Sequence, residues 1–136
     1  MIKPLVEYMA ASGNLGMQIG VNVVAGSFGV NSAPKCTAVI ARGGAVNPDL
    51  KAIRQTSIQL WTRAMSNDEA ITEQTRIFEW LINQGGFSIV QSDDPSNAWL
   101  VYSITTGNSP AWVSIDDSGH YLYSANLIVR AKKENV

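Results

Sequence analysis

The stretch from Ile53 to Gly86 constrains the fold of this chain most strongly, because a strand pattern changes directly into a helix pattern there. From Ile53 to Ala64, apolar and polar side chains alternate along the chain. Ile58 and Leu60 fall on one face of this segment, which is the period of a half-buried strand. The segment is therefore predicted to be a strand with one face turned toward a core.

A capped helix is predicted directly after this strand. Ser66 and Glu69 form the S-x-x-E signature of a capping box, which predicts a helix from Asn67 to Gln84, with Gly85 in the left-handed conformation that ends it. The apolar stripe of this helix consists of Ala70, Ile71, Ile77, Phe78, Leu81 and Ile82, completed by Gln74 and Thr75. A one-sided strand followed by a one-sided helix predicts a helix packed on a sheet.

Shorter patterns complete the fold prediction. They indicate a helix at Ile2–Ala11 and strands at Leu15–Gly26, Cys36–Arg42, Phe87–Val90, Ala98–Thr105, Trp112–Ile115 and Tyr121–Ala131. Glycine, proline, serine and asparagine indicate connections at Ser27–Lys35, Gly43–Asp49, Gly107–Pro110 and Asp116–Gly119. The prediction is an α+β fold: a mostly antiparallel sheet with the N-terminal helix and the long central helix on one face, in a single domain spanning residues 1–136.

Composition excludes several classes of partner. The net charge is −1, and the only local excess of basic residues is Arg130, Lys132 and Lys133, so the sequence shows no basic stripe for tight nucleic-acid binding. Cys36 is the single cysteine, which rules out an intramolecular disulfide and is typical of a small buried strand residue. No apolar run is long enough to span a membrane, and we predict no membrane association.

The most enzyme-like group in the sequence is Asp116, Asp117 and His120. Two carboxylates beside a histidine could act as acid–base groups or metal ligands. The Asp-Asp-x-Gly pattern is also what a tight turn requires, and we favour the turn. The sequence has no metal-ligand spacing, phosphate-binding glycine loop or G-x-S-x-G motif. We therefore predict that the chain is not an enzyme and holds no catalytic, cofactor or metal site.

Trp61, Trp80 and Trp112 lie outside the centre of the predicted apolar stripes. Trp61 falls on the polar face of its strand, and Trp112 follows a proline in a segment that looks exposed. A tryptophan in such a place can anchor a contact between subunits, or it can cover a second small core on the other side of the sheet. Both interpretations stay open from the sequence.

The segment from Pro110 to Asn126 resembles the C-terminal hairpin of phage minor capsid and tail terminator proteins. Those hairpins carry a proline, a strand that ends in aspartate (Asp116 here), a glycine turn and then Tyr-x-Tyr-Ser, here beginning at Tyr121. The resemblance extends in the same order from about Leu5 to Val129. It includes an N-terminal helix, Gly43-Gly44, the Ile58-Gln59-Leu60 strand and the helix with Ala70, Ile77 and Leu81.

The resemblance implies a structural virion protein of a tailed bacteriophage, located in the tail or neck after assembly in the host cytoplasm. Such proteins form a ring, commonly hexameric, at the head-proximal end of the tail, where the ring terminates tail tube polymerisation and joins tail to head. The implied partners are further copies of the chain, the tail tube protein and neck or connector proteins. Phage DNA would pass through the ring without sequence-specific binding.

Two alternatives stay open beside this interpretation. One is a neck adaptor or head-completion subunit of the connector, with the same ring symmetry. The other is a small-molecule binding or hydrolytic domain that uses Asp117 and His120 in a pocket against the sheet.

A ring requires two different complementary surfaces on each subunit. We expect the contact to involve the polar strand face and the flexible loops at Gly26–Lys35 and Gly43–Asp49. The candidate interface residues are Gln59, Trp61, Arg63, Phe28 and Trp112.

Overall fold

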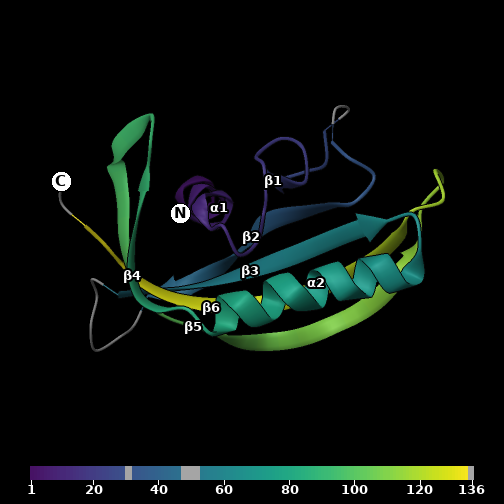
Figure 1. The fold of residues 1–136 in the computed structure, drawn as a ribbon. Coiled ribbons are helices and arrows are strands. Elements are labelled where there is room, and N and C mark those ends of the chain that lie inside the picture. Colours follow the sequence, from purple (N-terminus) through teal and green to yellow (C-terminus); the bar gives the residue numbers. More distant parts are fainter. Residues whose placement is uncertain (30–31, 47–52, 135–136) are drawn as a thin grey trace.

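The computed structural model describes residues 1–29, 32–46 and 53–134, which form one curled sheet of six strands with two helices (Figure 1). The elements are α1 (Ile2–Ala11), β1 (Val23–Ala25), β2 (Cys36–Val46), β3 (Ile53–Ala64), α2 (Asn67–Ile82), β4 (Gly85–Gln91), β5 (Asp94–Ile115) and β6 (Tyr121–Lys133). The strand order is β1-β2-β3-β6-β5-β4, and β1 runs parallel to β2 while the other neighbouring pairs are antiparallel. The protein is thus a mixed α/β fold dominated by its sheet.

The predicted strand–helix unit is confirmed. Ile58 and Leu60 of β3 are fully buried, and the first turn of α2 is capped by Ser66, whose Oγ accepts a hydrogen bond from the Glu69 amide at 3.2 Å. The C-terminal end differs from the prediction by a few residues. The helix ends at Ile82, Gly85 already belongs to β4, and Gly86 rather than Gly85 adopts a positive φ, at 63°.

The main core lies on the side of the sheet that faces both helices. It joins Leu5 and Met9 of α1 to Ile77 and Leu81 of α2 and to the inward-facing strand residues, such as Leu127. In Figure 1, α1 lies between β1 and the raised hairpin of β4 and β5. The ring of Tyr8 stacks on Phe87 of β4 with centroids 4.3 Å apart, so α1 connects the two ends of the curled sheet.

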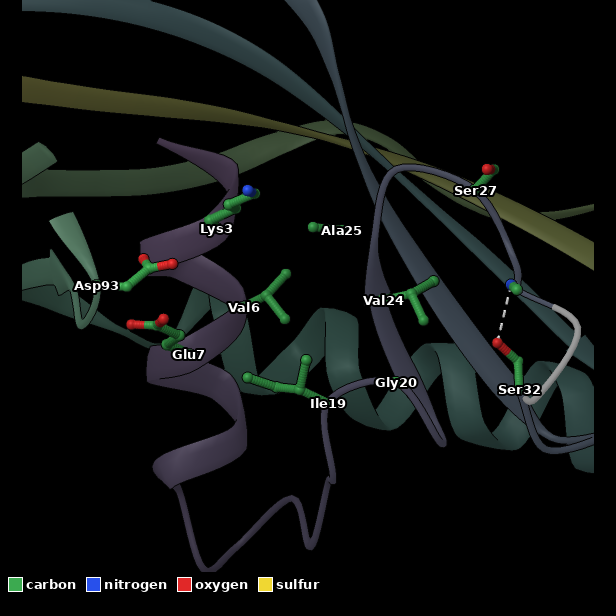
Figure 2. Close-up of a pocket in the computed structure, with 11 residues that line it drawn as sticks. Lys3, Val6, Glu7, Ile19, Gly20, Val24, Ala25, Ser27, Ser32 and Asp93 are labelled. Carbon is green, nitrogen blue, oxygen red and sulfur yellow. Dashed lines mark hydrogen bonds between the residues drawn. The ribbon is translucent and has the colours of Figure 1, made fainter.

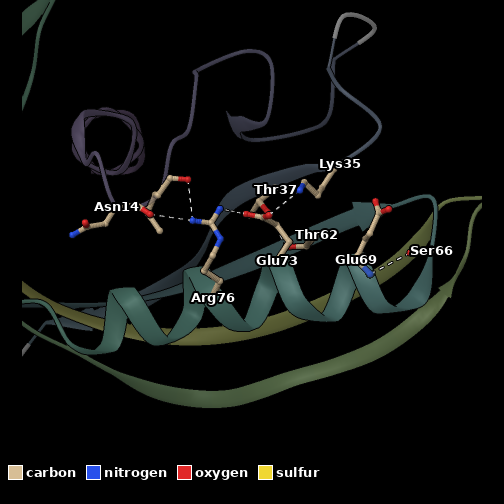
Figure 3. A network of polar contacts seen from close by, with 9 residues as sticks. Asn14, Lys35, Thr37, Thr62, Ser66, Glu69, Glu73 and Arg76 are labelled. Atoms are coloured by element: carbon tan, nitrogen blue, oxygen red, sulfur yellow. Dashed lines mark hydrogen bonds and ion pairs between the residues drawn. The ribbon is translucent and has the colours of Figure 1, made fainter.

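Polar contacts fix α2 along its length (Figure 3). Arg76 donates a hydrogen bond to the Leu15 carbonyl at 2.9 Å and forms an ion pair with Glu73. Glu73 also pairs with Lys35 at 3.5 Å. These contacts connect the outer side of the helix to the segment after α1 and to the start of β2.

Gln74 is the one polar member of the predicted helix stripe that is fully buried in the described chain. Its Nε2 donates to the Leu60 carbonyl at 3.0 Å and to the Tyr123 carbonyl at 2.8 Å. The side chain therefore connects α2 to two neighbouring strands through its Nε2, while its Oε1 is buried without a hydrogen-bond partner among the described residues.

The prediction of a strand from Leu15 to Gly26 is wrong over most of its length, because only Val23–Ala25 forms one. Gly16, Gly20 and Gly26 have φ values of 60°, 85° and 95°, so the backbone turns at each of them and cannot run as an extended strand. The apolar residues in this segment have another role, since Leu15 and Met17 lie between α1 and β1 and pack into the main core.

The predicted break at Gly107–Pro110 is also wrong, since the two strands around it form the single strand β5. Pairing with β6 continues from Ile104 to Ile115, and Gly107 and Pro110 are skipped at register shifts on either side of Asn108. A Cβ at Gly107 would lie only 3.1 Å from the Asn126 carbonyl oxygen, so glycine permits this close approach. Pro110 is tolerated because β4 does not extend this far along β5.

The predicted antiparallel pairing of the strand at Cys36 with the strand at Ile53 is confirmed. The connection predicted at Gly43–Asp49 begins later, because β2 continues to Val46 past a bulge at Gly43, which has a φ of 87°. Residues 47–49 of that predicted connection lie outside the described residues.

Candidate interaction surfaces

The sheet has a second face that neither helix covers. We call it the open face and define it by Gln59, Trp61, Ser124 and Asn126, which alternate with the core residues of β3 and β6. Side chains alternate strictly between the two faces of a strand, so this surface lies opposite the main core. The polar strand face predicted from the sequence is this open face.

The segment between β1 and β2 covers part of the open face. Parallel neighbouring strands need a crossover connection, and residues 26–29 and 32–35 are its described parts. Phe28 packs with Trp61 on a small apolar cluster formed by Val24, Cys36 and Ala38. The guanidinium of Arg63 lies 4.6 Å from the centre of the Phe28 ring.

Three of the predicted interface residues, Phe28, Trp61 and Arg63, therefore lie together, and we call them the aromatic–arginine cluster. Arg63 also donates hydrogen bonds to the Ser32 and Ala33 carbonyls, each at 3.2 Å. Trp61 is half-buried, so it forms part of a second small core rather than an exposed anchor. This is one of the two interpretations that the sequence left open.

Gln59 lies on the same face, two residues before Trp61, and accepts a hydrogen bond from Arg42 Nε at 2.7 Å. Asn126 of β6 is directly opposite Gln59, and its Oδ1 is buried without a hydrogen-bond partner among the described residues. The middle of the open face is thus polar and carries a cation.

Trp112 lies apart from the aromatic–arginine cluster, on the outer strand β5, where it is paired with Tyr123 and 57% exposed. Other large apolar side chains exposed near this end of the sheet are Met65, Val113 and Ile115. We call Met65, Trp112, Val113 and Ile115 the apolar end. Of these four residues, only Trp112 was predicted from the sequence to be exposed, because Ile115 fits a half-buried strand pattern and Met65 follows a strand end.

The Asp116 turn joins β5 to β6, as the sequence predicted. Asp116 Oδ1 accepts hydrogen bonds from the amides of Ser118, at 3.0 Å, and His120, at 2.8 Å. Its Oδ2 lies 3.1 Å from His120 Nδ1, while Asp117 is exposed. The hydrogen bond from the His120 amide lowers the pKa of Asp116, opposed by partial desolvation and assisted by the His120 side chain.

We expect Asp116→Ala to destabilise the β5–β6 turn, while Asp116→Asn keeps an oxygen acceptor and retains most of its order. Because the folded-state pKa of Asp116 lies below its unfolded value near 4, its charged form stabilises the turn above about pH 4. That contribution disappears as the pH falls through the folded pKa. Thermal unfolding from about pH 3 to 7 checks this, and the wild type and Asp116→Asn should converge at the acidic end.

The matched control for this experiment is Asp117→Ala, which removes a neighbouring carboxylate that has no role in the turn contacts above. We expect neither Asp117→Ala nor His120→Ala to remove any function of the protein. A metal bound at one equivalent and lost in these variants would contradict the assignment of this group as a turn.

A pocket of about 510 Å³ lies between α1 and the turns around β1 (Figure 2). Val6, Ile19 and Val24 form its apolar lining, and Glu7 and Asp93 lie at one side. The Glu7 carboxylate is already engaged, since it accepts hydrogen bonds from the amide and hydroxyl of Ser92, each at 2.9 Å. Asp117 and His120 do not line this pocket.

No group of three or more metal-binding side chains occurs among the residues that the structure describes. Cys36 is buried, as predicted, and burial raises the pKa of its thiol, which makes it a poor nucleophile. Within residues 1–29, 32–46 and 53–134, neither helix has the length and apolar content needed to cross a membrane.

Comparison with known proteins found no family model that matches this chain and no curated protein with significant sequence similarity to it.

Proposed function

We propose that this chain is a structural protein of a tailed bacteriophage virion. In this proposal it forms a ring, hexameric by resemblance, at the head-proximal end of the tail. The ring terminates polymerisation of the tail tube and joins the tail to the neck. The partners are other copies of the chain, the tail tube protein and a neck or connector protein, and the chain carries out no catalysis.

The observation that carries the proposal is the presence of two different exposed surfaces at opposite sides of the sheet. On one side, β1 pairs with β2 only at Thr37–Val39, and the segment with Phe28 lies beside this short edge. On the other side, β4 pairs with β5 only as far as Ser103. The part of β5 that carries Trp112 therefore has no outer neighbour in the described chain.

These two surfaces are unlike each other, which favours a head-to-tail contact. An isologous dimer would require one surface to match itself, whereas a heterologous contact joins unlike surfaces and closes into a ring when the rotation permits. The outer edge of β5 is interrupted by register shifts and by Pro110, features that discourage backbone pairing between sheets. We therefore assign the contact mainly to side chains, with Trp112 as its anchor.

The experiment that tests this function is loss of the protein during infection by the phage that encodes it. We expect overlong tails that fail to join heads, and restoration of normal virions when the wild-type chain is supplied. Electron microscopy of the lysate measures both tail length and attachment. Tails of normal length that lack heads would indicate the neck adaptor, and normal, intact virions would refute both ring assignments.

A further inference from the structure

The basic and acidic side chains of this protein are separated in space, although its net charge is only −1. Strands β2, β3 and β6 contain no Asp or Glu, and their charged residues are Arg42, Arg54, Arg63, Arg130, Lys132 and Lys133. The described acidic residues lie on the two helices, on β5 or in segments beside strand ends. The three middle strands are therefore uniformly cationic.

Strand pairing gathers four of these cations where β3 begins and β6 ends. Gln55 pairs with Arg130, Arg54 pairs with Ala131, and Ile53 pairs with Lys132. We call Arg54, Arg130, Lys132 and Lys133 the basic end. All four side chains are exposed, and none takes part in the ion pairs formed within the described residues. Arg130, Lys132 and Lys133 are close together in the sequence, and strand pairing adds Arg54, which is far from them along the chain.

The basic end continues onto the open face. Arg130 and Lys132 alternate with the buried Val129 and Ala131, so they belong to the face opposite the main core. Arg42 contacts Gln59, four residues beyond Gln55 on β3, which is about 13 Å farther along the strand. The side chains between these cations include the neutral polar Ser57 and Asn126 and the apolar Ile128, which pairs with Ser57. This surface offers cations and hydrogen-bond donors, and the described carboxylate beside it is Glu134, whose Oε1 accepts a hydrogen bond from the Ser88 hydroxyl at 3.0 Å.

We propose that the open-face surface from Arg42 to Arg130 and Lys132 of the basic end binds the sugar–phosphate backbone of duplex DNA without sequence specificity. Cations and neutral polar side chains are the groups that contact phosphates, and binding them releases counterions from the duplex. Among the described residues, neither helix covers the open face, and the segment with Phe28 covers only the part around Trp61 and Arg63. Arg42, Arg130 and Lys132 are therefore accessible to a rod-shaped polyanion. The orientation of this surface toward the lumen of the ring rests on the proposed function, while the binding itself can be tested separately.

The test is fluorescence anisotropy with a labelled duplex of random sequence, about 30 base pairs long, titrated from about 50 to 200 mM salt. The wild type should bind with a steep salt dependence. Arg130→Gln/Lys132→Gln should weaken binding by about tenfold or more at the lowest salt and reduce the slope of log K against log salt by about two. The control Lys3→Gln/Lys35→Gln changes the net charge equally on other surfaces and should bind nearly as the wild type does.

Equal losses in the two double variants would contradict a localised surface, as would a wild type that does not bind the duplex at low salt. Wild-type binding to anionic lipid vesicles or polyglutamate, with none to DNA, would assign the surface to a different partner and overturn the proposal. The mass of each protein is measured in the same samples. A ring without DNA binding would refute this inference alone, and DNA binding by a monomer would refute the ring alone.

Discussion

Replacing Leu81 by Ala should lower the free energy of unfolding by about 2–5 kcal/mol, the largest effect that we expect from one substitution in α2. Leu81 is fully buried where α2 meets the main core, and truncation removes apolar contacts and leaves a cavity. Phe78, which is 6% exposed, should behave in the same way. Chemical denaturation followed by circular dichroism measures both losses.

The matched control on the same helix is Thr72→Ala, because Thr72 is exposed and lies away from the core. We expect it to change stability by no more than about 0.5 kcal/mol. If Leu81→Ala and Thr72→Ala gave equal unfolding midpoints, the packing of α2 against the sheet would be wrong.

The second large effect is expected for Trp112→Ala, which should dissociate the proposed ring and leave the subunit folded. Trp112 is exposed in the isolated chain, so its removal costs little in folding. A tryptophan buried at a subunit contact typically contributes about 2 kcal/mol or more, and a closed ring repeats that loss at every contact. Light scattering for mass and circular dichroism for fold separate the two effects.

Two other aromatic substitutions serve as comparisons for Trp112→Ala. Tyr102→Ala removes an exposed aromatic residue from the half of β5 next to β4 and should leave the ring intact. Trp61→Ala should destabilise the subunit itself by about 1–3 kcal/mol, because Trp61 packs into the small core beneath Phe28. A Trp112→Ala protein with the mass of the wild-type ring would exclude the apolar end as the contact.

The strand–helix unit could be predicted because each signal in it is local. The alternation in β3, the Ser66 cap and the stripe on α2 all depend on residues close together in sequence. The continuous path of β5 through Gly107 and Pro110 could not be predicted in this way. The continuous strand depends on its neighbour β6, which is long enough to pair with both halves of β5. It also depends on Gly107, because the Asn126 backbone lies too close to this position for a side chain.

The candidate surfaces were predictable only in part, for the same reason. Phe28, Trp61 and Arg63 were singled out separately, and the structure brings them together because the parallel β1–β2 connection crosses the open face. Trp112 was singled out correctly as exposed, but it lies apart from that cluster. Three residues of the basic end form a local basic excess in the sequence, whereas the position of Arg54 beside them depends on pairing between β3 and β6.

The central claim is that copies of this chain assemble into a ring, and the mass of the purified wild-type protein in solution tests it most directly. Native mass spectrometry with negative-stain images should give a single closed species of about six subunits, formed alone or on addition of tail tubes. A protein that stays at the 14.7 kDa mass of one chain, even when mixed with tail tubes, would contradict the account.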